Sequence, residues 1–256
     1  MVIDPLGCLG EIVQFPCLED NYGFLIRDAS SGQVVAIDTP DAVAILAVLD
    51  ERKWPLDYIL NTHWHADHVG GNAALKLATG ARVVAPQIEM TRIPDVDIAI
   101  GDGAIISLGA LEIVAMATSG HTLGHMSFYI PKLESIFVGD TLFVMGCGRI
   151  FEGTSGMMWH SLAKIAALPD QTRVYCAHEY SAANALFAVT IDDSTETLAR
   201  AEHLLAMRDR GEPTVPTTVG IERKTNPFLR LPDKIIGSAE VKAAQFARLR
   251  AQKDKF

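Results

Sequence analysis

The sequence predicts a layered α/β or α+β sandwich that is followed by a helical C-terminal region. Short β-branched runs separated by turns fill the first two-thirds of the chain, and a few helical segments lie between them. After residue 178 the pattern changes to helices. Two groups of strands with helices between them are typical of folds built from packed layers around one hydrophobic core.

The expected strands are rich in β-branched and aromatic residues and end at turn residues. Their ranges are 34–38, 57–62, 82–85, 104–108, 111–115, 126–130, 135–139 and 173–177. Helices are expected among them at 41–49, 72–79 and 157–168. Gly80 stands at a C-cap position of the second helix, and Pro169 ends the third.

The C-terminal region is expected to be a small helical appendage. Residues 179–190 are apolar at helical spacing, and Asp193 with Glu196 predicts a capping box that opens a second helix. A Pro/Thr-rich linker over 212–227 leads to a final helix that begins at Ser238. We therefore expect two domains, one over 1–178 and one over 179–256.

Composition excludes several classes of protein. The chain has 256 residues, enough for one or two domains, and its 49% hydrophobic content supports a sizeable core. The net charge of −9 opposes binding to duplex nucleic acid, which depends on many cationic contacts with phosphates. No run approaches the roughly 20 apolar residues of a membrane helix.

The N-terminus and the cysteines favour a cytoplasmic protein. The first 17 residues lack a basic start and are interrupted by prolines, so we expect no signal peptide. The four cysteines are scattered and form no CxxC pair, which favours free thiols over a disulfide scaffold. They are Cys8, Cys17, Cys147 and Cys176.

The strongest motif is THWHADH at 62–68, directly after an expected strand. Alternate residues of an extended segment share a face, so His63 and His65 can converge on one metal ion. The chain then turns, which lets Asp67 and His68 point toward a second ion. Three of the eight histidines fall within the six residues 63–68, so a loop that is histidine-rich by chance is a poor explanation.

Three further candidate ligands stand after other expected strands. His121 lies in SGHTLGH, Asp140 in GDTLF and His178 in AHEY. Each is weak by itself, because a strand-end Asp often caps a helix and a lone His is often a core residue. Together they place imidazole and carboxylate groups at strand ends, where layered α/β proteins commonly assemble active sites.

These motifs resemble the metallo-β-lactamase superfamily and, within it, the glyoxalase II family of hydroxyacylglutathione hydrolases. The similarity covers nearly the whole chain. It runs through LEDNY (18–22), THWHADH, SGHTLGH, GDTLFVMGCGRIFEG (139–153), AHEY, NPFLR (226–230) and the terminal Arg250 and Lys253-Asp254. HxHxDH alone identifies only the superfamily, whereas GDTLF with GCG and the basic C-terminal helix indicates this branch.

The resemblance implies a four-layer αββα metallo-β-lactamase sandwich with a small C-terminal α-helical domain. It also implies a binuclear metal centre in which Asp140 bridges the two ions. The first ion would be held by His63, His65 and His121, and the second by Asp67, His68 and His178. Zinc is the metal we expect, and iron or manganese would suit the same nitrogen and oxygen ligands. His125 resembles a residue that packs beside the site, and Cys147 and Cys176 are expected to be buried residues.

The implied reaction is hydrolysis of S-D-lactoylglutathione to D-lactate and glutathione, which completes methylglyoxal detoxification. Two cations about 3.5–4 Å apart lower the pKa of a shared water toward neutrality. The resulting hydroxide attacks the thioester, and a leaving thiolate needs little help from a general acid because thiols ionise near pH 8.5. Asp67 and Asp140 are therefore the expected catalytic carboxylates.

The resemblance assigns substrate binding to Arg149, Phe151, Tyr180, Arg250 and Lys253. Glutathione carries two carboxylates, which cationic side chains bind by charge-assisted hydrogen bonds. Two of these positions depart from the family pattern, since many members have Lys and Tyr where this chain has Arg149 and Phe151. Arginine keeps the charge but changes its geometry, and phenylalanine lacks one hydroxyl.

Other activities on the same scaffold remain alternatives. They are hydrolysis of another thioester or a lactone, and a glutathione persulfide dioxygenase with one iron. A β-lactamase lacks the GDTLF context and the basic C-terminus, and a nuclease is opposed by the net charge. A purely structural metal site is opposed because such sites are usually closed and cysteine-rich. We expect a monomer without nucleic-acid or membrane partners.

Overall fold

The computed structural model describes residues 1–5 and 9–256 in two compact units. Unit 1 comprises Met1–Ala117 and Gly124–Phe137, and unit 2 comprises Thr118–Leu123 and Val138–Phe256. Cys8 lies outside the described residues. The described cysteines, Cys17, Cys147 and Cys176, are free and buried, as expected for them.

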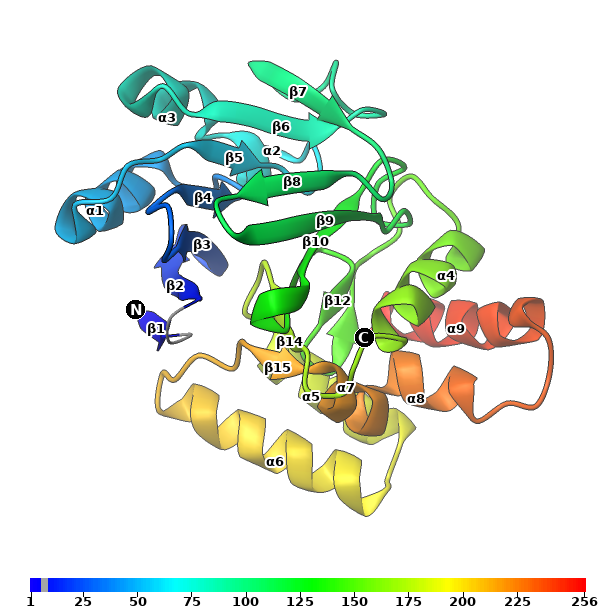
Figure 1. The fold of residues 1–256 in the computed structure, drawn as a ribbon. Helices are drawn as coiled ribbons and strands as arrows, with labels where there is room; N and C mark the ends of the chain where they lie inside the picture. Colours follow the sequence, from blue (N-terminus) through cyan, green and yellow to red (C-terminus); the bar gives the residue numbers. More distant parts are fainter. Residues whose placement is uncertain (6–8) are drawn as a thin grey trace. The chain divides into compact units, whose positions relative to one another are not determined.

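Unit 1 contains a seven-stranded sheet whose spatial order follows the chain (Figure 1). The strands are β1 (Val2–Pro5), β2 (Gly10–Cys17), β3 (Asn21–Asp28), β4 (Val34–Ile37), β5 (Tyr58–Leu60), β6 (Arg82–Pro86) and β7 (Val96–Ile100). The first four pair antiparallel, and β4 to β7 pair parallel. Strands β4 and β5 are short apolar runs, as expected where a sheet is buried on both faces, whereas the edge strand β7 is partly exposed.

Helices α1 (Ala42–Arg52) and α3 (Asn72–Thr79) cover this sheet. The Asp41 side chain caps α1 by accepting from the amides of its first turn, and Gly80 ends α3 in the left-handed conformation. Ile45 and Leu75 bring the apolar faces of the two helices into one buried cluster with strand residues such as Val83. This packing holds β4 and β5, from which the site segments start.

Unit 1 also contributes strands to a second sheet. They are β8 (Ile105–Leu108), β9 (Leu111–Ala117), β10 (Met126–Ile130) and the first residues of β11 (Ser135–Gly139). All three pairings are antiparallel. A short 3-10 turn, η1 (Pro131–Leu133), connects β10 to β11.

Unit 2 is mainly helical. Its strands are the hairpin β12 (Leu142–Phe143) and β13 (Gly146–Cys147) and the antiparallel pair β14 (Arg173–Cys176) and β15 (Thr217–Thr218). Its helices are α4 (Ser155–Ala166), α5 (Ser181–Ile191), α6 (Thr195–Asp209), α7 (Val219–Thr225), α8 (Pro227–Asp233) and α9 (Ala239–Lys253). Helix α9 packs against α4 and α8, and α5 packs against α6. Among the described residues, no helix has both the length and the apolar character needed to cross a bilayer.

The eight expected strands are all present, with ends that differ by no more than two residues. Strands β1 to β3, β7, β12, β13 and β15 were not expected. The capping-box prediction is wrong, because Ser194, not Asp193, caps α6 and accepts the Thr197 amide at 3.4 Å. Glu196 therefore falls inside the first turn of α6.

The predicted linker over 212–227 is also wrong in its second half. Residues 217–218 form β15, α7 follows, and α8 begins at Pro227. Asn226 caps α8, and proline is well suited to the first helical position because its missing N–H has no partner there. The final helix begins after Ser238, as expected.

Candidate metal centre and substrate pocket

The candidate metal ligands of unit 1 lie on the ligand loop, which we define as Thr62–His68. This loop follows β5 and ends in the short helix α2 (Ala66–Val69). His63 Nε2 lies 3.0 Å from His65 Nδ1, and Asp67 Oδ2 lies 3.5 Å from His68 Nε2. The loop thus presents two pairs of ligand atoms, in the grouping that the spacing of the motif predicts.

Asp38, directly after β4, holds the ligand loop through hydrogen bonds to Thr62 and His68. Its carboxylate accepts the Thr62 amide and the Thr62 hydroxyl, each at 2.7 Å, and it lies 2.8 Å from His68 Nδ1. A carboxylate at Nδ1 holds the proton there, so Nε2 of His68 is the nitrogen available to a metal. Asp38 has a φ of 57°, a conformation that aspartate tolerates better than most residues.

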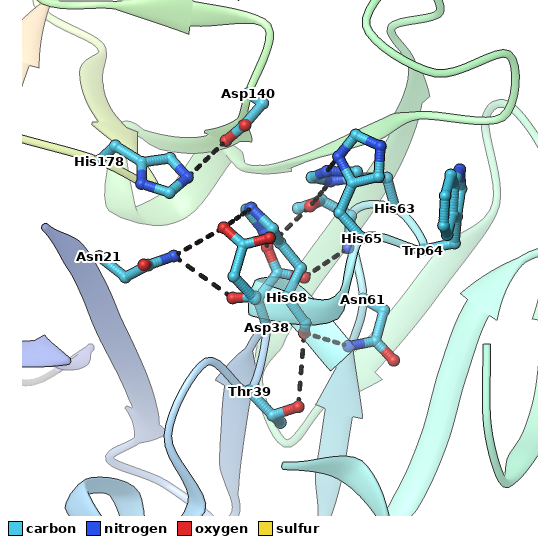
Figure 2. Close-up of polar contacts among 12 residues, drawn as sticks. Asn21, Asp38, Thr39, Asn61, His63, Trp64, His65, His68, Asp140 and His178 are labelled. Atoms are coloured by element: carbon cyan, nitrogen blue, oxygen red, sulfur yellow. Dashed lines mark hydrogen bonds and ion pairs between the residues drawn. The ribbon is translucent and has the colours of Figure 1, made fainter. Parts of the chain in front are cut away.

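Further polar contacts orient the same loop (Figure 2). Asn21 donates to Asp67 Oδ2 at 3.2 Å, and Asn61 donates to the His68 carbonyl at 3.1 Å. The buried Glu89 accepts the Trp64 amide and the Gly124 amide, each at 2.8 Å.

The ring of His125 lies beside the ligand loop. It stacks on the ring of His63 with centroids 4.9 Å apart and is fully buried. This position fits the expectation that His125 packs against the site.

The candidate ligands of unit 2 meet at Asp140, which follows β11. Asp140 Oδ2 lies 3.4 Å from His121 Nε2. Asp140 Oδ1 lies 3.4 Å from His178 Nε2, as Figure 2 shows for this pair. Two ligands that bind one ion at 2.0–2.2 Å in tetrahedral geometry lie about 3.3–3.6 Å apart. Each oxygen of Asp140 therefore faces a different histidine at a distance compatible with ligands that share a metal ion.

The chemistry of these residues fits divalent metal ions. His121 Nδ1 lies 2.8 Å from the Arg149 carbonyl, so this ring also has its Nδ1 engaged and its Nε2 turned to the ligand set. Thiolates are not part of the set. Burial raises the pKa of Cys147 to about 11 and the pKa of Cys176 further, which keeps both thiols protonated.

A pocket of about 390 Å³ opens beside His121 and Asp140 in unit 2. Its other lining residues are Phe143, Cys147, Arg149, Phe151, Tyr180, Ala183, Asn184, Arg250 and Lys253. All five residues predicted to bind the substrate are among them. The pocket is therefore lined both by two candidate ligands and by three basic side chains, those of Arg149, Arg250 and Lys253.

The basic residues of the pocket are held differently from one another. Arg149 is exposed, whereas Arg250 is only 6% exposed. The guanidinium of Arg250 donates to the Cys147 carbonyl at 2.9 Å and pairs with Asp254 at 2.9 Å. Arg250 thus supports the pocket wall, a role that the prediction did not include.

Lys253 lies at the end of α9, where its ammonium donates to the Ala183 carbonyl at 2.8 Å. Burial lowers its pKa, and the neighbouring cations Arg250 and Arg149 lower the pKa further. Three cations in one pocket repel one another, so an anionic ligand would stabilise the charged form of each.

Aromatic rings form the remaining walls. The Tyr180 ring stacks on the His178 ring with centroids 4.8 Å apart, and Phe143 meets Tyr180 edge-on at 5.2 Å. Phe151 packs edge-on against His121 at 5.1 Å and is 61% exposed. A large exposed ring at the mouth of a pocket is suited to contact with a bound ligand.

Sequence reasoning missed Asp38 and Glu89 as supports of the ligand loop and Phe143 and Asn184 as pocket residues. Asp38 follows an expected strand, as Asp140 does, and that position was the available signal. Glu89 has no comparable signal in the sequence.

Comparison with known proteins identifies the family. The family model described as the metallo-beta-lactamase superfamily matches residues 1–178, and the model described as hydroxyacylglutathione hydrolase C-terminus matches residues 179–256. The chain therefore belongs to the metallo-β-lactamase superfamily. Within that superfamily it is a member of the hydroxyacylglutathione hydrolase family.

Named relatives support membership of the hydroxyacylglutathione hydrolase family. The hydroxyacylglutathione hydrolase of Maricaulis maris is 50% identical over 96% of this chain and 98% of its own length. The hydroxyacylglutathione hydrolase of Hyphomonas neptunium is 46% identical over 98% of this chain and 100% of its own length. The chain is accordingly an enzyme, a hydrolase of this family.

Solved structures agree on the fold. ETHE1 from Myxococcus xanthus is similar with a TM-score of 0.68 and 25% identity, over 93% of this chain and 90% of that one. The BLEG-1 B3 metallo-beta-lactamase is similar with a TM-score of 0.64 and 22% identity, over 86% of this chain and 99% of that one. The predicted α+β metallo-β-lactamase fold with a C-terminal domain is confirmed.

Proposed function

We propose that this protein hydrolyses S-D-lactoylglutathione to D-lactate and glutathione, and so completes methylglyoxal detoxification. One observation carries this function: the carboxylate of Asp140, set at ligand distance from two histidines, lies on the lining of a pocket that also contains three cations. A candidate metal ligand thus stands next to side chains that suit the carboxylates of glutathione. Family membership supports the same substrate.

The metal centre that we propose is built from histidine and aspartate side chains. Three candidate sets support it, namely His63 with His65 and His121, Asp67 with His68 and His178, and His63 with His68 and Asp140. The first two sets would each hold one ion, and Asp140 would bridge the ions. Nitrogen and oxygen ligands suit zinc, and they suit iron or manganese as well.

The residues of the chain have separate tasks in the reaction. When bound, two divalent cations would supply a hydroxide nucleophile at neutral pH and would offset negative charge that develops on the thioester oxygen. Asp67, oriented by Asn21, accepts a hydrogen bond from the attacking water. Asp38 keeps His68 in the tautomer that ligation needs. The leaving thiolate is stable without a proton donor because thiols ionise near pH 8.5.

Substrate binding falls to the pocket of unit 2. Arg149 and Lys253 hold the glutathione carboxylates, and Phe151 and Tyr180 pack against the apolar parts of the peptide. Residues 179–256 would form the substrate-binding domain and residues 1–178 the catalytic domain. We further propose a cytoplasmic monomer without nucleic-acid or membrane partners.

The test is hydrolysis of S-D-lactoylglutathione by metal-loaded protein, with a matched coenzyme A thioester and the Asp140→Asn variant measured beside it. Loss of a bridging carboxylate removes several kcal/mol of transition-state stabilisation, so the variant should lose about 10²-fold to 10³-fold in kcat. Turnover confined to the glutathione ester would support the function.

Two results would point elsewhere. Protein that holds two metals per chain but does not hydrolyse the glutathione ester would overturn the function, and other thioesters and lactones would be the next substrates. One iron per chain with oxygen uptake on glutathione persulfide would establish a dioxygenase, the activity class that we weighed as the alternative.

A further inference from the structure

The β12–β13 hairpin forms one wall of the pocket. We define the pocket hairpin as Leu142–Cys147, in which Val144 and Met145 make the turn between the two paired strands. Phe143 and Cys147 line the pocket, and Arg149 follows two residues later. The position of this short backbone segment therefore sets the distance between the aromatic wall and the cation.

The turn of the pocket hairpin is strained. Met145 has a φ of 54°, in the left-handed region that residues with a Cβ rarely adopt. A conformation of this kind persists only where the surroundings hold it in place. Two paired residues on each side of the turn are too few to do so alone.

Side chains from the helices supply the missing support by bonding to the hairpin backbone. Glu222 of α7 accepts the Met145 amide at 2.9 Å. Asn226 donates to the carbonyls of Phe143 and Gly146, at 3.1 and 2.9 Å. Asn184 and Arg250 donate to the carbonyls of Val144 and Cys147, at 3.1 and 2.9 Å.

Glu222 is the centre of this arrangement. It is fully buried. Besides the backbone amide of Met145, its carboxylate accepts the Thr217 hydroxyl at 2.8 Å and the side-chain NH₂ of Asn226 at 2.9 Å. Burial raises its pKa, which shows that the site disfavours the charge. A buried acid is a costly way to gain stability, because an apolar side chain of similar size is often neutral or better. A requirement for an acceptor at the Met145 amide explains its presence.

We propose that Glu222 is a positioning residue for substrate binding, which acts by holding the strained turn of the pocket hairpin. Glu222 is not among the residues that line the pocket. Its effect passes through the Met145 amide and the Asn226 side chain to Phe143 and Arg149. Because the substrate is that of the proposed function, the experiment needs a readout that does not depend on catalysis.

The experiment compares Glu222→Gln and Glu222→Leu in the full-length, metal-loaded protein. Glutamine can present its oxygen to the Met145 amide and its NH₂ to the Thr217 hydroxyl, so this variant should keep the wild-type KM. Leucine removes the acceptor, so KM for S-D-lactoylglutathione should rise about 10-fold to 100-fold, the scale for a misplaced substrate contact. In both variants kcat should stay within about threefold and the metal content should not change.

Amide hydrogen exchange of the segment 142–149 gives the independent readout. We expect the Met145 amide to exchange at least about tenfold faster in Glu222→Leu and at the wild-type rate in Glu222→Gln. Asp192→Asn is the matched control, since Asp192 is a buried carboxylate of unit 2 that accepts the Ser194 amide at 3.1 Å. This control should lower the melting temperature without changing KM or the exchange of the hairpin.

Several outcomes would overturn the positioning role. A folded Glu222→Leu protein with wild-type KM and protected Met145 amide would do so, as would a KM change equal to that of Asp192→Asn. If Glu222→Leu does not fold, Glu222→Asp, whose carboxylate is one methylene shorter, should show the same changes in smaller size. Wild-type protein inactive on the glutathione ester would overturn the proposed function, and hydrogen exchange would still decide the role of Glu222.

Discussion

The ligand loop of unit 1 and the pocket hairpin of unit 2 are both short segments held by buried acids, but the acids act on different groups. Asp38 bonds to an imidazole nitrogen of His68 as well as to the backbone of the loop. Glu222 accepts the backbone amide of Met145 in the hairpin. It also accepts the side-chain NH₂ of Asn226, which itself donates to the hairpin backbone.

This difference predicts two separable kinds of defect. A carboxylate on a ligand histidine controls which ring nitrogen is free, so its loss should weaken metal binding and lower kcat. Support of the hairpin backbone controls the shape of the pocket, so its loss should raise KM and leave the metal in place. The following variants test this division, from the largest expected effect to the smallest.

Asp38→Asn should have the largest effect. Asparagine tolerates the left-handed backbone at this position, but its NH₂ replaces one of the two acceptor oxygens. Either the Thr62 amide or His68 Nδ1 then faces a donor instead of an acceptor, which disturbs the ligand loop or the His68 tautomer. Metal affinity should fall about 10-fold to 100-fold, measured by competition with a chelator, and kcat should fall with it at limiting metal. Asp57→Asn is the control, since Asp57 accepts the Val34 amide at 2.8 Å. Unchanged metal affinity in Asp38→Asn would contradict the division.

Arg149→Ala should raise KM for the glutathione ester about tenfold, because a charge-assisted hydrogen bond to a substrate carboxylate is lost at an exposed position. Metal content and kcat should remain near those of the wild type. Arg210→Ala, which removes an exposed arginine that is paired with Glu212 on the same unit, is the control. A fall in bound metal would show that the pocket and the metal centre do not separate in this way.

Lys253 should make KM depend on pH. Its pKa is lowered by burial and by Arg250 and Arg149, so the ammonium loses its proton at a lower pH than an ordinary lysine. KM should therefore rise about fivefold as the pH increases from neutrality toward the ordinary lysine pKa, because the ammonium is lost before that pH is reached. Lys253→Arg keeps the charge over this range and should remove the dependence. The same slope in both proteins would assign the titration to another group.

Phe151→Tyr should have the smallest effect and the opposite sign. The added hydroxyl offers the substrate one more hydrogen bond, worth about 0.5 kcal/mol at this exposed position. KM should fall about twofold with kcat unchanged, in steady-state kinetics. Tyr180→Phe removes a hydroxyl from the same pocket and should move KM upward. A higher KM in Phe151→Tyr would show that the exposed ring already makes the better contact.

The candidate ligands were predictable because their chemistry is concentrated in short motifs. His63, His65, Asp67 and His68 lie within six residues, and Asp140 and His178 each follow an apolar strand. Strand ends meet at the edge of a sheet, so local pattern and topology agree at these positions. The roles of these residues stay a prediction until the metal is measured.

The supports of the site were not predictable in the same way. Glu89 and Glu222 are single acids in segments without periodicity, and each is important through a backbone amide that is far away in the sequence. Glu222 lies 77 residues from the amide of Met145. Arg250 was predicted as a substrate contact, but only the structure shows that its guanidinium also bonds to the Cys147 carbonyl.

The fold shows the same limit. Strands β2 and β3 were missed because Pro16 and Gly23 interrupt the run of β-forming residues, although the two strands pair over their full length. Helices α7 and α8 were missed because threonine and proline are typical of linkers. Tertiary packing and the caps at Thr218 and Asn226 outweighed those local preferences.

The burial of the Cys147 thiol affects its reactivity toward disulfides. Burial raises the pKa of this thiol to about 11, although the residue lines the pocket from which a thiol product departs. Exchange with a disulfide requires the thiolate. The raised pKa therefore disfavours covalent capture of Cys147 by an oxidised form of the product.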